Sequence, residues 1–419
     1  MKKFNRRGIF LFLAVMGPGI ITAAADNDAG GITTYSVAGA KYGFQLLWVL
    51  LVITVVLVVV QEMSARMGAV TQKGLGELIR EEFGVKWTLF ALTALLVANL
   101  ATTVAEFAGI AASLGMFGIP KLVSVPVAAI GIWFLVVKGS FRTVERVFLF
   151  FAVIFGSYVV AGLLAKPDWG QALGAMVRPS LPSTLDARYF LLIIAVIGTT
   201  LTPWMQYFLQ ATVVDKGIHI KDYKYQKWDV LIGAFLTDFV SFFIIVAAAA
   251  ALYNFKTGHG VEIKDATTAA QALKPLAGRY AELLFALGLF NASLLASAVV
   301  PLSTAYTYSE AFGWEVGVSR RWKEAPAFYG IYTLCIAFGS LVVLVPSDRL
   351  IEMMVAAQSV SGILLPIVLF FMLKLINNKT IMGEYTNSKI YNIVTWAMAL
   401  GLIGLTVMYL VCKILGLGV

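Results

Sequence analysis

Hydrophobic residues along this chain gather into long apolar runs, and short loops between the runs carry most of the charged residues. A transmembrane helix needs roughly 20 predominantly apolar residues. Eleven runs reach that length, at approximately 9–40, 44–67, 88–116, 119–138, 145–165, 187–214, 228–253, 280–310, 326–345, 349–375 and 392–415. The pattern predicts an all-α polytopic membrane protein with eleven transmembrane helices.

The composition agrees with this prediction. Of the 419 residues, 60% are hydrophobic and 13% are charged, and the mean hydropathy is +0.85, whereas soluble domains average about 25% charged residues. The net charge of +9 does not indicate nucleic acid, because the basic residues lie in short loops beside apolar runs. Cys335 and Cys412 lie inside apolar runs and are interpreted as packing residues. The expected surroundings are therefore a lipid bilayer.

The distribution of basic residues predicts the orientation. With a cytoplasmic N-terminus, most of the 32 Lys and Arg residues fall in cytoplasmic loops, as the positive-inside rule requires. An odd number of helices then places the C-terminus outside. The basic N-terminus and first apolar run resemble a signal peptide, but Pro18 interrupts the run, so we expect it to remain in the protein. The chain is expected to form one membrane domain, residues 1–419, in the cell (inner) membrane.

Two of the apolar runs are interrupted in the middle. In the first run, residues 25–31 read Ala-Asp-Asn-Asp-Ala-Gly-Gly, and in the sixth run residues 198–203 read Gly-Thr-Thr-Leu-Thr-Pro. Irregular backbone at membrane depth is tolerated only where it is buried in protein or lines a wet cavity. Pro203 removes a backbone donor and frees carbonyl groups one turn earlier. Both runs are therefore predicted to be broken helices.

The two breaks lie five helices apart, which predicts a LeuT-type fold. Inverted-repeat transporters of this kind bind their substrate at the midplane, between two discontinuous helices. The first repeat would cover approximately 9–165 and the second 187–375, with 392–415 as an additional helix. The alternative interpretation is an ordinary kink at Pro203 and a packing site at Gly30 and Gly31. A pair of breaks together with an intramembrane aspartate favours the binding site.

Several motifs resemble the Nramp family of divalent metal transporters. They are Gly-Pro-Gly at 17–19, Asp-Ala-Gly-Gly at 28–31, the stretch 38–48 (Ala-Gly-Ala-Lys-Tyr-Gly-Phe-Gln-Leu-Leu-Trp), residues 61–68, Ala-Glu-Phe-Ala-Gly at 105–109 and Phe-Gly-Ile-Pro at 117–120. The number and order of the helices agree with the family over nearly the whole chain. The resemblance implies a LeuT-like fold with a cytoplasmic N-terminus, and a transport function rather than an enzymatic one.

The metal-site motifs depart from the family pattern. Where the family has Asp-Pro-Gly-Asn, this chain keeps Asp28 but has Gly31 in place of the Asn. Where the family has Met-Pro-His, it has Thr202, Pro203 and Trp204, so that both the thioether and the imidazole are lost. The family glutamine of the tenth helix, eight residues before a proline, corresponds to Gln358. In the third helix the family glutamate matches Glu106, while the neighbouring acidic position is Thr103.

These departures favour a hard cation. A thioether suits softer ions than Mg²⁺, which prefers oxygen ligands and commonly keeps several waters. An oxygen-only, widened site therefore resembles the NRAMP-related magnesium transporter branch, which is expected to carry Mn²⁺ as well. The transported ion is the expected ligand, no cofactor is expected, and a monomer is plausible. The candidate metal-site residues are Asp28, Thr202, Gln358, Gly31, Ala25, Thr199 and Gln206.

The same departures bear on proton coupling. The two histidines, His219 and His259, fall in loops, so no imidazole lies in the membrane to titrate near neutrality. We therefore expect alternating-access transport of Mg²⁺ without proton coupling. A proton-coupled Mn²⁺/Fe²⁺ transporter is the alternative, since Glu106 and Asp28 remain as possible proton carriers.

Other acidic residues allow more than one interpretation. Asp26 would point away from Asp28 on a helical turn, and either draws cations inward or faces a polar vestibule. Glu106 has a structural alternative, an ion pair with a basic residue inside the bundle. Asp238 and Glu352 are interpreted as paired or vestibule residues.

Two competing functions are less well supported. A sodium-coupled carrier of an organic solute would need a helix N-terminus facing a substrate carboxylate, where Asp28 repels anions. A membrane enzyme using Asp26 and Asp28 lacks accompanying His or Cys ligands and a phosphate-binding loop.

Overall fold

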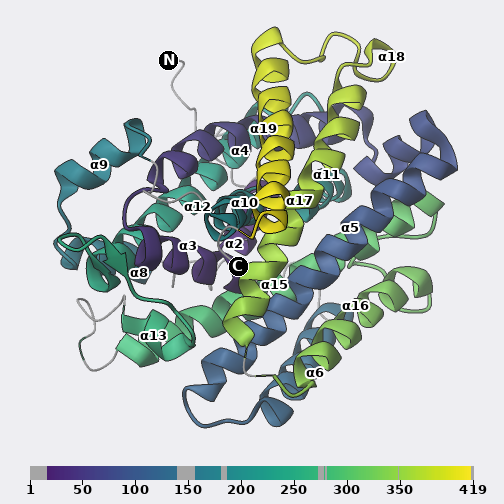
Figure 1. The fold of residues 1–419 in the computed structure, drawn as a ribbon. Helices are drawn as coiled ribbons and strands as arrows, with labels where there is room; N and C mark the ends of the chain where they lie inside the picture. Colours follow the sequence, from purple (N-terminus) through teal and green to yellow (C-terminus); the bar gives the residue numbers. More distant parts are fainter. Residues whose placement is uncertain are drawn as a thin grey trace, which may run out of the picture.

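The fold is a bundle of long helices (Figure 1). The computed structural model describes residues 17–138, 156–180, 186–271, 278, 281–347 and 349–416. The longer helices are α2 (Pro18–Asp26), α3 (Ala29–Tyr42), α4 (Leu47–Thr71), α5 (Leu75–Gly115), α6 (Lys121–Lys138), α8 (Gly156–Leu164), α9 (Trp169–Val177), α10 (Ala187–Thr200), α11 (Pro203–Asp215), α12 (Tyr223–Leu252), α15 (Ala281–Phe312), α16 (Pro326–Leu344), α17 (Leu350–Ile376) and α19 (Lys389–Ile414). The smaller elements are α13 (Ala266–Ala270), α18 (Lys379–Met382) and an antiparallel hairpin of β1 (Tyr253–Asn254) and β2 (His259–Gly260).

The helices confirm the predicted fold class. Within the described residues, nine helices are long and apolar enough to cross a membrane when α10 and α11 are taken as one span. The first predicted segment appears as the pair α2 and α3, and its residues 9–16 lie outside the described residues. The fifth appears as α8, and residues 145–155 likewise lie outside the description. Both predicted breaks are present, one between α2 and α3 and the other between α10 and α11.

The third predicted segment, 88–116, corresponds to the apolar part of α5 after Gly84, but α5 itself begins earlier, at Leu75. The part before Gly84 carries Glu77, Arg80, Glu81 and Glu82, so a search for apolar runs does not find it. Gly84, at φ +74°, bends the chain between this charged part and the apolar part that follows.

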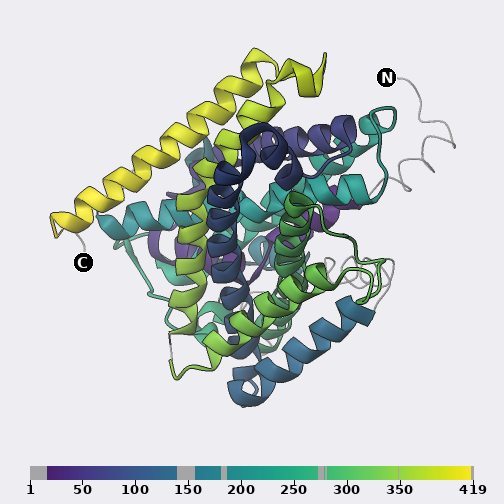
Figure 2. The same ribbon diagram turned by 90° about the vertical axis from the view of Figure 1, so that its right-hand side faces the viewer.

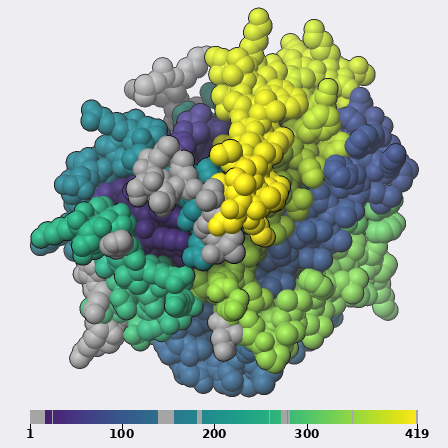
Figure 3. Space-filling view, viewed as in Figure 1, coloured from purple at the N-terminus to yellow at the C-terminus, as the bar shows by residue number. Residues whose placement is uncertain are grey.

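The last helix lies on the outside of the bundle. In Figure 1 α19 stands at the front of the molecule, and the turned view of Figure 2 shows it along the outer edge; in Figure 3 its side chains cover part of the face turned toward the viewer. Only 22% of its most apolar stretch is buried in the bundle, and its exposed side chains include Ile390, Ile393 and Leu400. Such a surface suits contact with lipid tails.

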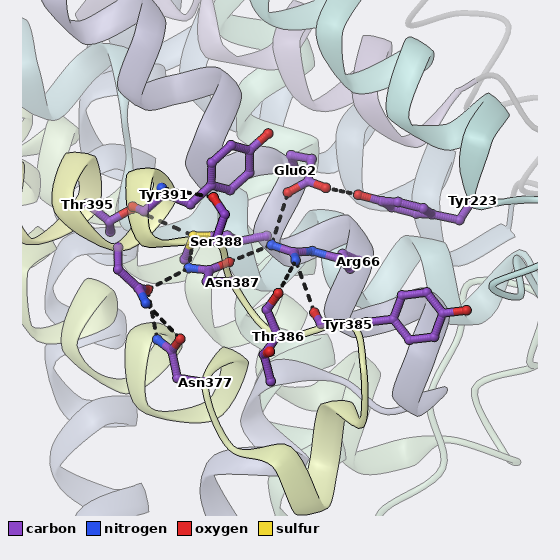
Figure 4. Close-up of polar contacts among 12 residues, drawn as sticks. Glu62, Arg66, Tyr223, Asn377, Tyr385, Thr386, Asn387, Ser388, Tyr391 and Thr395 are labelled. Carbon is purple, nitrogen blue, oxygen red and sulfur yellow. Dashed lines mark hydrogen bonds and ion pairs between the residues drawn. The ribbon is translucent and has the colours of Figure 1, made fainter.

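A polar cluster connects α4 to the chain between α18 and α19 (Figure 4). Arg66 donates to the carbonyl oxygens of Tyr385 and Thr386 at 3.0 and 3.1 Å and to Oδ1 of Asn387 at 2.5 Å. It also pairs with Glu62 at 3.2 Å. Tyr223, the first residue of α12, donates to the same glutamate. Arg66 is therefore held by charge-assisted hydrogen bonds to the loop before α19 and by Glu62, one turn earlier on α4.

Helix α2 is attached to α12 near both of its ends. The carboxylate of Asp229 accepts from the backbone amides of Gly17 at 3.1 Å and Gly19 at 2.6 Å, and so satisfies the free N–H groups that start α2. At the other end, Thr237 donates to the carbonyl of Ala23 at 2.9 Å. A Cβ atom at Gly233 would lie 2.8 Å from the Gly19 carbonyl oxygen. The two backbones thus approach more closely than larger residues would permit.

Candidate metal site

The first break places Asp28 between two short helices. Helix α2 ends at Asp26, Asn27 is non-helical, and Asp28 is the N-cap of α3. The Asp28 carboxylate accepts from the backbone amide of Gly31 at 2.5 Å, as an N-cap aspartate does. The last four carbonyl groups of a helix lack intrahelical partners, and that of Ala25 is one of them. The break therefore combines a carboxylate with free backbone oxygens.

Helix α17 brings Gln358 to this carboxylate. The Gln358 side-chain nitrogen lies 3.2 Å from each of the two Asp28 carboxylate oxygens. Gly30 makes this approach possible, since a Cβ atom there would lie 1.9 Å from the same nitrogen. Both Asp28 and Gln358 are 0% exposed.

Helix α5 contributes Glu106 to the other side of the break. Its carboxylate accepts from the backbone amide of Ala29 at 3.1 Å. No basic partner for Glu106 occurs within the described residues, so the alternative of an ion pair inside the bundle finds no support there. Glu106 instead satisfies one of the free N–H groups at the start of α3.

The second break leaves the buried hydroxyl of Thr202 without a hydrogen-bond partner among the described residues. Helix α10 ends at Thr200, and Pro203 is the first residue of α11, a position that proline favours. Thr202 is the N-cap of α11, but its hydroxyl makes no capping hydrogen bond. This hydroxyl is buried and has no partner among the described residues.

Gly31 leaves space between Thr199 and Asp28. A Cβ atom at Gly31 would lie 3.0 Å from the Thr199 hydroxyl and 3.2 Å from Oδ1 of Asp28. The Thr199 hydroxyl is also buried without a partner in the described part of the chain, as is the side-chain oxygen of Gln358. The breaks therefore gather buried oxygen atoms whose hydrogen-bonding capacity is unused.

Gln206 turns back onto its own helix. With its amide nitrogen oriented toward the first turn of α11, it donates to the carbonyl oxygens of Thr202 at 2.6 Å and Pro203 at 2.9 Å. These carbonyls belong to the N-cap and the first residue of α11, where the helix begins after the break. In this arrangement Gln206 stabilises the second break and makes no contact with Asp28 among the described hydrogen bonds.

The remaining acidic predictions had mixed outcomes. Glu352 pairs with Arg349 at 3.6 Å at an exposed position, as the paired interpretation predicts. Asp238 is buried, and neither of its carboxylate oxygens has a hydrogen-bond partner in the described residues, so of its two interpretations the paired one has no support there and the vestibule one stays open. No cluster of three or more His, Cys, Asp or Glu side chains that could hold a metal occurs within the residues that the structure describes.

Comparison with known proteins decides the family. Residues 19–412 match the family profile described as Natural resistance-associated macrophage protein-like, or Nramp. The chain belongs to the Nramp family. Together with its membrane-spanning helices, this makes the protein a membrane transporter rather than an enzyme.

Curated relatives of this Nramp protein match it over nearly its full length. The divalent metal cation transporter MntH of Bacillus subtilis (strain 168) is 29% identical over 97% of this chain and 93% of its own. MntH of Deinococcus radiodurans is 28% identical over 98% of this chain and 92% of its own.

Solved structures show the same fold. The Eremococcus coleocola manganese transporter, in complex with an aromatic bis-isothiourea compound, superposes with a TM-score of 0.77 at 17% identity, over 96% of this chain and 87% of that one. MhsT in complex with L-phenylalanine gives a TM-score of 0.58 at 13% identity, over 94% of this chain and 98% of its own. These likenesses support the LeuT-type arrangement with two broken helices.

Proposed function

We propose that this protein carries divalent metal ions, Mg²⁺ and also Mn²⁺, across the cell membrane by alternating access. The observation that carries the proposal is the position of Asp28, a fully buried carboxylate at the break of the first helix. A buried intramembrane carboxylate is costly and marks an ion path in most membrane proteins. Curated relatives described as divalent metal cation transporters support the same class of substrate.

The proposed ligands are oxygen atoms from both breaks and from α17. Asp28 is the anchor, and the unpartnered oxygens of Thr202, Thr199 and Gln358 complete the set with the backbone at Ala25. Gln358 must turn its amide so that the oxygen rather than the nitrogen faces the ion. Gly31, which has no side chain, leaves space for the ion and its waters. Gln206 stabilises the second break through its bonds to the α11 carbonyls, or becomes a ligand after it releases them.

The chemistry of these ligands favours Mg²⁺. The candidate residues contain neither sulfur nor imidazole, and Mg²⁺ binds through one or two carboxylates while keeping several waters. With a single carboxylate as anchor, the protein strips few waters from the ion. Mn²⁺ accepts the same oxygen ligands, so its transport is expected beside that of Mg²⁺.

We further propose that transport is not coupled to protons. The potential across the membrane supplies about 2.3 kcal/mol per charge per 100 mV, which is enough to drive a divalent cation inward. The alternative is a proton-coupled Mn²⁺/Fe²⁺ transporter, and it is favoured by the position of Glu106 beside Ala29, next to Asp28. Measuring the pH inside liposomes during Mg²⁺ uptake separates the two, because strict acidification would support coupling.

The proposed arrangement in the membrane follows from the charge distribution. The N-terminus would be cytoplasmic and the C-terminus outside, with the Arg66 cluster at the cytoplasmic end. The whole chain would act as one transport domain and, in the simplest case, as a monomer, with repeats at approximately 9–165 and 187–375.

The test is metal uptake by the purified protein in liposomes. We expect Mg²⁺ and Mn²⁺ to enter, with each inhibiting the other, and Asp28→Ala to abolish uptake of both. Asp168→Ala is the matched control, since Asp168 is an exposed N-cap of α9 far along the chain from the breaks. Mn²⁺ uptake that is insensitive to millimolar Mg²⁺ would count against the magnesium assignment, and uptake by Asp28→Ala would refute the site.

A further inference from the structure

A second pair of buried carboxylates lies on the α12 side of the first break. Asp26 is the last residue of α2, and Asp238 lies in the middle of α12. They are 2% and 4% exposed. Hydrogen bonds from Asn27 to Thr237 and from Thr237 to the Ala23 carbonyl join α2 and α12 at the residues next to them. The electrostatic neighbours that affect Asp26 are both acidic, Asp28 and Asp238. Asp26 and Asp238 therefore lie near Asp28. The Asp28 carboxylate itself is hydrogen-bonded to Gln358 of α17, on the other side of the break.

These carboxylates lack the partners that buried acids need. One oxygen of Asp26 and both oxygens of Asp238 have no hydrogen-bond partner among the described residues. The Thr54 hydroxyl lies near Asp238, but it donates to the carbonyl of Leu50 at 2.8 Å. A buried polar group without a partner costs about 1–3 kcal/mol, and a charged group costs more. Within the described part of the chain nothing compensates these oxygens, which leaves them available to a ligand.

The surrounding backbone is fixed by polar side chains. Asn27 donates to the Thr237 hydroxyl at 2.7 Å, and the Ser241 hydroxyl lies 3.3 Å from the Asn27 side-chain oxygen. The carbonyl end of α2 points at the same place, and a helix C-terminus carries partial negative charge. The hydroxyl of Tyr35 is hydrogen-bonded to Thr200 at 2.7 Å and lies within electrostatic range of both carboxylates. The cluster is thus a pre-arranged set of oxygens with an excess of negative charge.

We propose that Asp26 and Asp238 form a second cation site, which takes a hard divalent cation such as Mg²⁺ alongside the Asp28 site. Oxygen ligands select hard cations. Two carboxylates carry a charge of minus two, which a divalent ion balances and a monovalent ion does not. The ion would lie within the group formed by α2, α3 and α12, whereas the first site also depends on α17. The second site does not require Asp28 to bind metal.

The test counts Mn²⁺ ions bound by the purified full-length protein, for example by equilibrium dialysis with detection by electron paramagnetic resonance. We expect two ions for the unmodified chain, one for Asp238→Asn, one for Asp28→Ala, and none for the double variant. Asp168→Asn, at an exposed helix cap, should keep two. A single bound ion in the unmodified chain, with the same count in Asp238→Asn, would overturn the proposal and indicate that protons neutralise the pair.

The design separates the two sites and guards against misfolding. If Asp28→Ala leaves the count at two while Asp238→Asn lowers it, the proposed transport site fails and the second site stands. Asp238→Asn is nearly isosteric, and its thermal melting should match that of the unmodified protein. If it does not fold, Asp26→Asn removes the other carboxylate and should give the same loss of one ion. A full count of two in that variant would refute the proposal.

Discussion

The contact between Gly30 and Gln358 allows a sharp test of how the site is built. A Cβ atom at Gly30 would lie 1.9 Å from the side-chain nitrogen of Gln358, and 2.8 and 2.9 Å from its Cδ and Cγ. In Gly30→Ala the glutamine side chain must therefore move away, and it loses both hydrogen bonds to Asp28. Because the Gln358 side chain is fully buried, it cannot simply turn into solvent.

The expected magnitude follows from the metal contact that is lost. In the proposed metal-bound state the Gln358 oxygen faces the ion, and a displaced glutamine can no longer supply it. A polar contact to a charged group contributes about 1.5–3 kcal/mol. Since about 1.4 kcal/mol corresponds to a factor of ten, metal affinity should weaken by roughly 10- to 150-fold. The assay is Mn²⁺ binding to the purified protein, with Gly131→Ala as control, because a Cβ atom at Gly131 meets nothing within 4 Å.

A double-variant cycle tests the mechanism itself. If Gly30→Ala acts by displacing the glutamine, it should have little further effect in a Gln358→Ala background, where the clashing atoms are absent. Additive losses in the two backgrounds would refute this reasoning and indicate that Gly30 acts on the break by another route.

Three further predictions concern the frame around the site. Arg66→Ala should lower the melting temperature, since breaking a buried ion pair costs about 3–5 kcal/mol and leaves Glu62 without its cation; unchanged melting would contradict the role of this cluster. Gly39→Ala should destabilise the protein by roughly 1–3 kcal/mol in the same assay, because its Cβ would lie 2.3 Å from the Ile245 carbonyl oxygen, whereas Gly401→Ala meets nothing within 4 Å and should be neutral. Thr202→Met adds a thioether and should shift uptake toward Mn²⁺ over Mg²⁺; an unchanged ratio in competition assays would argue against Thr202 as a ligand.

The breaks could be predicted because their causes are local in the sequence. An aspartate that caps a new helix, as Asp28 does, and a proline that begins one, as Pro203 does, leave their signatures within a few residues. The same locality explains why apolar runs gave the spans correctly but missed the charged start of α5 at Leu75. The length of an apolar run marks the part of a helix that crosses the membrane, and it does not mark a charged extension such as the part of α5 before Gly84.

The pairings across the bundle could not be predicted in this way. Nothing in the sequence near Glu106 says that it binds the backbone amide of Ala29, and nothing near Asp229 says that it caps α2. These contacts join residues far apart in the chain, and they depend on how the helices are arranged. The sequence therefore offered a basic partner for Glu106 as one alternative but not the bond to Ala29, since a backbone N–H group carries no residue-specific signal.

The attachment of α2 to α12 limits the ways in which the first half-helix can move. Asp229 holds the beginning of α2 through two backbone amides, while Thr237 and Asn27 join the two helices near the break. A hinge motion of α2 alone would have to break charge-assisted hydrogen bonds at one end and buried side-chain bonds at the other. The two helices should therefore rock as one rigid body, so that distances between labels on α2 and α12 stay constant through the transport cycle while those from α2 to α5 change.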